Sequence, residues 1–413
     1  MRRYLLVSTC LVAVAAPAAA ETTISTTVNG PVRTSTVKTG GLPDDILINS
    51  TGVVNGNASG GVIIDSNHDL NNQGTIQIGN VNNVAAVDVL AGVTSDITVG
   101  GKIIVDEPFA PTDADNDGDL DGPFATGTGR FGIRTNGAMT GNILVNSTGT
   151  ITVEGNNSAG ISLGGLLTGN FRHDGKTSVL GNDSTAIRLS DVSGNTRIAG
   201  TVTAVGEGST ALQSTGNIGG SMVLQGTIVA TGYRFTTPPA DPSKLDADDL
   251  LQGGPAVSIE GNVAKGIIVA VPPKDASTTD TDEDDDGIED AKEGSAAIAS
   301  FGSAAALRIG SAGAITIGAS EGTGTGFGLI VDGTILGNGV YTGVDGNALQ
   351  IGGLGGTVSI ANGIGVTGTI EAKSLDRNAT AVRLGAGATT PELRNAGKIL
   401  ASSGNNALAS ATA

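Results

Sequence analysis

Short apolar alternations, separated by small and polar residues, recur along this chain. One kind of segment opens with glycine and continues with alternating β-branched residues, as in GTITV from Gly149. A second kind has a small residue before the alternation, as in AGISL around Ile161, and a weaker third kind precedes the first, as in GNILV from Gly141. Segments of this length with a period of two, bounded by Gly, Asn, Ser or Asp, predict strands joined by tight turns.

The segments repeat at a nearly fixed distance. Gly149, Gly175, Gly200 and Gly226 are 26, 25 and 26 residues apart. Three different short strands in each repeat of about 25 residues predict an all-β fold, a right-handed parallel β-helix (β-solenoid) whose aliphatic positions stack from coil to coil. An all-β sandwich is the alternative, but it leaves the fixed spacing unexplained. Glycine and asparagine between the strands are expected to adopt positive φ.

About a dozen copies can be assigned, which predicts a rod roughly 60 Å long at about 4.8 Å per coil. The first kind of segment opens at Gly74, Gly101, Gly149, Gly175, Gly200, Gly226, Gly266, Gly313, Gly333, Gly368 and Gly397. The second kind is centred on Val62, Val87, Ile161, Ile187, Leu212, Val257, Leu307, Leu349, Val382 and Leu408.

The first twenty residues have the features of a secretory signal. Arg2 and Arg3 precede an apolar run, and small residues stand before Glu21. The apolar run is too short to span a bilayer. We therefore expect residues 1–20 to be removed on export and residues 21–413 to form a single β-solenoid domain.

Composition narrows the class of protein further. The one cysteine, Cys10, lies in the signal, so the exported chain must be stabilised by burial and backbone pairing rather than by disulfides. Sixty-six glycines, no tryptophan and 2% aromatic residues argue against an ordinary globular enzyme core. Without Arg2 and Arg3, 20 basic residues remain against 40 acidic ones, a net charge of −20. This charge disfavours nucleic acid and anionic lipid as partners.

Three acidic, proline-rich insertions interrupt the repeat, at residues 106–130, 233–254 and 272–297. They hold 21 of the 40 acidic residues and 8 of the 13 prolines, so most of the negative charge lies in them. Each follows a segment of the first kind and precedes one of the second kind. All three are therefore predicted to leave the solenoid at one corner, where the stack continues past them. We call them the first, second and third insertions.

Two insertions carry carboxylates at the spacing of a calcium-binding loop, with a glycine at the sixth position. Both resemble the DxDxDGxxD loops of EF-hand-like and thrombospondin type 3-like repeats, which implies one calcium ion each, held more weakly in the first insertion. Solvated acidic loops without metal are the alternative. The predicted ligands are Asp282, Asp284, Asp286, Ile288 (through its carbonyl), Asp290 and Glu293 in the third insertion, and Asp113, Asp115, Asp117, Asp119 and Asp121 in the first.

Other candidate chemistry is sparse, and we expect no enzymatic activity. The second insertion contains Asp246, Asp248 and Asp249 but matches no metal motif, and His68 and His173 are isolated in the sequence. An outward arginine recurs, which suits either an acidic glycan or, as we favour, a solvated strand face. A β-helix polysaccharide lyase is the enzymatic alternative. The recurring arginines are Arg134, Arg188, Arg308 and Arg383.

The signal, the cysteine-free coils rich in Gly, Asn and Thr, and the acidic insertions together resemble the passenger region of a Gram-negative autotransporter, a type V secretion protein. The resemblance covers nearly all of residues 21–413 and rests on the style of the repeat. It implies display at the cell surface or release outside the outer membrane, and a structural or adhesive role toward a host or neighbouring cell surface, a glycan or a matrix. A calcium-dependent surface-layer or biofilm matrix protein is the alternative.

The end of the sequence leads to one further expectation. Residues NALASATA stop within a coil, and no translocating barrel follows. We therefore expect the chain to be truncated at its C-terminus, with membrane contact only through a missing C-terminal barrel.

Overall fold

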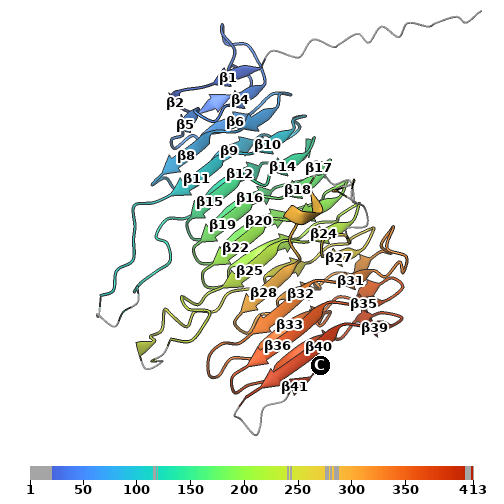
Figure 1. Ribbon diagram of the computed structural model, residues 1–413. Helices are drawn as coiled ribbons and strands as arrows, with labels where there is room; N and C mark the ends of the chain where they lie inside the picture. The colour runs from blue at the N-terminus through green and yellow to red at the C-terminus, as the bar shows by residue number, and fades with distance from the viewer. Residues whose placement is uncertain are drawn as a thin grey trace, which may run out of the picture.

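The computed structural model describes residues 21–114, 118, 120–239, 241, 244–274, 279, 281–282, 288–404 and 411–412. The strands wind into one elongated stack, with the N-terminal coils at one end and the C-terminal coils at the other (Figure 1). Every strand pair within the three long sheets is parallel. The predicted right-handed parallel β-helix is confirmed.

Each coil contributes one strand to each of three twelve-stranded sheets, which we call A, B and C in chain order. Sheet A contains β1 (Thr22–Ile24), β4 (Ile46–Ile48), β7 (Leu70–Asn72), β10 (Ile97–Val99), β14 (Ile143–Val145), β18 (Phe171–His173), β21 (Thr196–Ile198), β24 (Met222–Leu224), β27 (Ile267–Val269), β31 (Leu329–Val331), β35 (Ile364–Val366) and β39 (Leu393–Asn395).

Sheet B contains β2 (Thr27–Asn29), β5 (Val53–Asn55), β8 (Thr75–Gly79), β11 (Lys102–Asp106), β15 (Thr150–Glu154), β19 (Lys176–Leu180), β22 (Thr201–Val205), β25 (Thr227–Thr231), β28 (Ala297–Phe301), β32 (Thr334–Asn338), β36 (Thr369–Ser374) and β40 (Lys398–Ser403). Sheet C contains β3 (Val32–Arg33), β6 (Val62–Ile64), β9 (Val84–Val89), β12 (Arg130–Thr135), β16 (Ala159–Leu163), β20 (Thr185–Leu189), β23 (Thr210–Ser214), β26 (Val257–Ile259), β29 (Leu307–Ile309), β33 (Gly346–Ile351), β37 (Ala379–Leu384) and β41 (Ala411–Thr412).

Inward side chains stack in register along the axis. In sheet A, Ile97 pairs with Leu70 on one side and Ile143 on the other, and each is at most 1% exposed. In sheet B, Ile103 stacks on Ile151 in the same way. Because burying one such side chain contributes about 1.5–3 kcal/mol, columns of aliphatic residues stabilise the rod with few aromatic residues.

Glycine is required at the corner between sheets A and B for a reason other than the expected positive φ. Gly175, Gly200 and Gly226 do not have positive φ. A Cβ atom at Gly200 would lie 1.9 Å from the carbonyl oxygen of Gly175, and one at Gly226 would lie 1.8 Å from that of Gly200. Glycine is needed here because stacked backbones approach closely. Positive φ occurs instead between sheets B and C, for example at Asn157 (51°) and Gly206 (147°).

A short fourth row of strands, which the three-strand repeat does not predict, lies between sheets C and A. It begins with β13 (Met139–Thr140) and β17 (Leu167–Thr168) and ends with β30 (Ile315–Ile317), β34 (Val358–Ile360) and β38 (Ala388–Thr389). Single bridges connect the two parts. The segment at Gly313, predicted as a sheet B strand, forms β30 of this row instead. The predicted strand at Leu408 lies outside the described residues.

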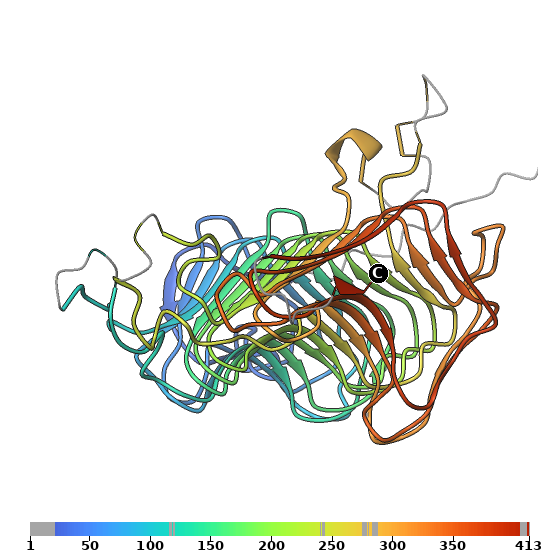
Figure 2. The same ribbon diagram turned by 90° about the horizontal axis from the view of Figure 1, so that it is seen from below.

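The prediction that all three insertions leave at one corner is wrong for the third. The first lies between β11 and β12 and the second between β25 and β26, at the corner between sheets B and C. The third lies between β27 and β28, at the corner between sheets A and B, and projects from a different side (Figure 2). The cause is that the segment at Gly266 forms β27 of sheet A, because a period-two alternation does not reveal which sheet a strand joins.

Candidate functional site

A buried ion pair fixes the base of the first insertion. The Glu107 carboxylate accepts hydrogen bonds from the backbone N–H groups of Thr126 (2.6 Å) and Gly127 (2.7 Å) and pairs with Nη1 of Arg130 at 3.0 Å. The side chains of Glu107 and Arg130 are 3% and 1% exposed. Burial opposes ionisation, but the hydrogen bonds and the Arg130 charge hold the pKa of Glu107 below its usual value.

The predicted calcium loop of the first insertion closes on itself. Thr112 and Asp121 form an antiparallel bridge, and the Asp121 carboxylate accepts a hydrogen bond from the N–H of Ala114. Asp113 accepts one from the N–H of Gly118 at 3.2 Å. The two ends of the predicted ligand set therefore lie in one loop. The other predicted ligands, Asp115, Asp117 and Asp119, lie outside the described residues.

The third insertion folds back onto the face of sheet A. Asp290 begins the short 3-10 helix η2 (Asp290–Lys292), and its N–H donates to the carbonyl of Thr281 at 2.9 Å. Glu293, the predicted twelfth ligand, has a side chain that is 1% exposed and pairs at 2.5 Å with Nη2 of Arg197 in β21. Ile288 lines a cavity of about 370 Å³ with side chains of β14 and β18. Calcium in this loop stays a prediction; Asp282 is described, whereas Asp284 and Asp286 lie outside the described residues.

The first and second insertions meet, although three coils separate them in the stack. The N–H of Gly122 in the first insertion donates to Oδ2 of Asp248 in the second at 2.7 Å. Arg234 of the second insertion pairs with the same carboxylate at 2.9 Å and donates to the carbonyl of Gly122. Its guanidinium carbon lies 4.9 Å from the centre of the Phe124 ring. We call this contact the loop junction; Arg234 holds it by charge, hydrogen bonding and a cation–π contact.

Three carboxylates gather at the loop junction. Asp121, Asp246 and Asp248 each offer an oxygen within 4.8 Å of the others, the one such group of three in the described part of the chain. A hydrogen bond with Asp248 raises the pKa of Asp246. Burial opposes the ionisation of Asp248, but hydrogen bonds from Asp246 and Arg234 hold the pKa of Asp248 below its usual value. Carboxylate oxygens from two loops are suitable ligands for calcium.

The sequence predicts a calcium-binding role for Asp121 but none for Asp246 or Asp248. The latter two lie in the insertion that matches no motif, and Asp121 lies in another insertion more than a hundred residues away. The position of the two insertions in the repeat could have predicted that these residues lie close together. Both insertions follow a segment of the first kind and precede one of the second kind, which places them at the same corner.

An aromatic cavity of about 350 Å³ lies at the loop junction. It is lined by Gly118, Leu120, Phe124, Val205, Tyr233, Arg234 and Phe235. Tyr233 is buried, and burial raises the pKa of its phenol to about 12. Its ring meets that of Tyr341 edge-on at 4.8 Å, and the hydroxyl of Tyr341 donates to the carbonyl of Phe235 at 2.7 Å. The second insertion is therefore fixed to the turn between β32 and β33 as well as to the first insertion.

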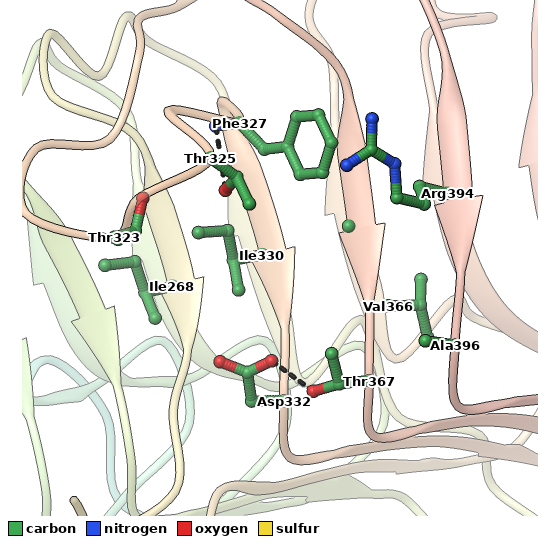
Figure 3. Close-up of a pocket in the computed structure, with 11 residues that line it drawn as sticks. Ile268, Thr323, Thr325, Phe327, Ile330, Asp332, Val366, Thr367, Arg394 and Ala396 are labelled. Atoms are coloured by element: carbon green, nitrogen blue, oxygen red, sulfur yellow. Dashed lines mark hydrogen bonds between the residues drawn. The ribbon is translucent and has the colours of Figure 1, made fainter.

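A second cavity, of about 340 Å³, lies on the outer face of sheet A (Figure 3). Ile268 and Ile330 are adjacent in register on that face, and the Phe327 ring lies over Gly365, where a Cβ would approach it to 2.6 Å. The Arg394 guanidinium stacks on Phe327 at 5.0 Å. The cavity is mainly apolar and differs from the loop junction in having no acidic cluster among the described residues.

The two histidines have different surroundings. His173 is fully buried, and burial lowers its pKa to about 4, so the ring is neutral at pH 7. Its Nε2 forms a hydrogen bond with the hydroxyl of Thr177. His68 lies 3.0 Å from Asp45. The outward arginines share one row of sheet C. Arg134 pairs with Asp88, and serine and glutamine residues stand between the arginines of the row.

Comparison with known proteins finds no matching family model, no matching curated protein and no matching solved structure. Within the described residues, none of the helical segments has the length and apolar character needed to cross a membrane.

Proposed function

We propose that this chain is an exported rod displayed on, or released from, the surface of a Gram-negative bacterium, with a structural or adhesive role like that of an autotransporter passenger. The observation that carries the proposal is the stack of three twelve-stranded parallel sheets with a two-loop junction on its side. Such a rod is stabilised coil by coil without disulfides and holds a binding surface at a fixed distance from its ends. The signal-like residues 1–20 and the absence of cysteine after residue 20 support export.

Surface display is tested on intact cells that express the full chain. We expect an antibody against residues 21–413 to label unpermeabilised cells or to detect the protein in the medium. Added protease should remove this antibody labelling while a periplasmic marker stays protected. A variant with arginine at Leu5 and Leu11 interrupts the apolar run and should keep the protein inside. Full protection of the wild-type chain from protease, together with its absence from the medium, would contradict the proposal.

We also propose calcium as a structural ion of the insertions, supported by the ligand spacing and by the three carboxylates at the loop junction. Calorimetry with calcium chloride on residues 21–413 should detect binding near 1 mM, the range of extracellular calcium modules. Removing residues 271–295 should abolish one class of site, and Asp121→Asn with Asp246→Asn should weaken another. Absence of heat and of any shift in melting temperature would refute the calcium proposal. A calcium-dependent rise in light scattering would support the surface-layer alternative.

A further inference from the structure

We propose that the loop junction is a docking surface for a basic segment of a partner protein that also carries apolar side chains. This inference rests on the proposed function, because a displayed rod needs a defined contact surface. It goes beyond that function in naming the surface and the chemistry of its partner. Three properties of the described residues support it. They are apolar surface, negative charge and an arginine of this chain that is already bound by a ring and a carboxylate at the junction.

The apolar part is concentrated where the rest of the chain has little. After residue 20 the chain has nine aromatic residues, and four of them lie in the first and second insertions, which make up about an eighth of that length. Three of the four, Phe124, Tyr233 and Phe235, line the junction cavity. Leu120 and Leu250, one from each insertion, are 49% and 40% exposed. A small cation would leave these side chains uncovered, whereas a peptide with apolar side chains would bury them.

The charge of the two insertions selects a cationic partner. Together they contain 11 acidic residues and three basic ones. Arg130 pairs with Glu107 and Arg234 with Asp248, both within the insertions. Without bound calcium, the junction therefore presents the carboxylates of Asp121, Asp246 and Asp248 against the one guanidinium of Arg234, beside an apolar cavity. Such a surface attracts lysine and arginine side chains and repels acidic glycans and anionic lipids.

The junction already holds a basic side chain of its own in this manner. The Arg234 guanidinium contacts both the Phe124 ring, 4.9 Å from its centre, and the Asp248 carboxylate, at 2.9 Å, and its side chain is 9% exposed. Phe235 lines the same cavity, and Asp121 and Asp246 lie beside Asp248. A partner's arginine or lysine would find the same combination of ring face and carboxylates there.

The test uses residues 21–413 in calcium-free buffer and a synthetic peptide of alternating lysine and leucine, with a glutamate–leucine peptide as the charge control. Calorimetry should show saturable binding of the lysine peptide, weakened but not abolished by added salt, and none of the glutamate peptide. Asp121→Asn with Asp246→Asn should weaken binding about tenfold. The matched control, Glu321→Gln with Glu392→Gln, removes the same charge elsewhere and should change affinity less than about twofold.

A second pair of variants tests the apolar part. Leu120→Ser should weaken binding several-fold, whereas Leu384→Ser, at a residue equally exposed but on sheet C, should have no effect. Circular dichroism checks that each variant is folded. Equal losses in the junction and control variants would show attraction by overall charge only and would overturn the proposal, as would absence of binding. Surface labelling of cells expressing the same variants should be unchanged, so failure of docking is distinguished from failure of export.

Discussion

At the scale of single residues, the solenoid interior contains a polar pair where its neighbours are aliphatic. His173 stacks between Val145 and Ile198, and its Nε2 lies 2.8 Å from the hydroxyl of Thr177. The ring's Nδ1 is buried without a hydrogen-bond partner. A buried, unsatisfied nitrogen costs about 1–3 kcal/mol, so this position weakens the central coils.

Burial lowers the pKa of His173 to about 4 in the folded state, so its ring stays neutral down to about that pH. In the unfolded state the ring takes up a proton near pH 6.5. Stability is therefore lost as pH falls through this window, by about 2 kcal/mol between pH 7.5 and pH 5. The double variant His173→Ile, Thr177→Val should be more stable at pH 7.5 and should lack this part of the pH dependence. Urea unfolding of both proteins at both pH values measures these differences in the free energy of unfolding. An equal loss in both proteins would contradict the assignment.

The ion pair at the base of the first insertion gives a second prediction. Glu107→Ala leaves the Arg130 charge buried without its partner and should cost about 3–5 kcal/mol in urea unfolding at neutral pH. Because the pKa of Glu107 is lowered in the fold, its contribution should also decline as the wild-type protein is acidified. Glu321→Ala removes an exposed pair with Lys265 and should cost less than about 1 kcal/mol. Similar losses for both variants would disprove the buried role.

At the scale of elements, the sequence predicts strands better than it predicts their sheets. The alternation at Gly149, Gly175 and Gly200 identified successive strands of sheet B, because no insertion disturbs the spacing there. Near Gly266 an insertion breaks the spacing, and a sheet A strand has the same alternation as a sheet B strand. The partners of side chains are still less predictable. Glu293 fits a calcium motif in sequence, but its contact with Arg197 depends on how the insertion folds over sheet A.

We expect the stack to tolerate removal of most of the third insertion. Its base is closed by a hydrogen bond from the N–H of Ala296 to the carbonyl of Ala270 at 2.8 Å. Joining these two residues by deletion of 271–295 would leave a two-residue turn like Asp174–Gly175 between β18 and β19. We expect an unchanged far-UV circular dichroism shape and a melting temperature within a few degrees of wild type. Loss of the β spectrum would mean that the insertion is part of the solenoid's core.

At the scale of the whole molecule, the rod brings together segments that the sequence keeps far apart. The spacing of the repeat predicted the fold, because each coil repeats the same burial pattern. It did not predict the loop junction, because the contact of Gly122 with Asp248 spans three intervening coils and depends on the path of irregular segments. The acidic composition of the insertions was evident, but the aromatic cavity between them required the three-dimensional arrangement.

The first two insertions form one surface while the third lies apart, and distances between pairs of spin labels distinguish this arrangement from three separate loops. The chain after residue 20 has no cysteine, so labels can be placed in pairs at Leu120 with Leu250 and at Leu120 with Lys292. Double electron–electron resonance should give a short, narrow distance distribution for the first pair and a clearly longer one for the second. A broad distribution for Leu120 with Leu250, as long as that to Lys292, would show that the first two insertions do not share a surface.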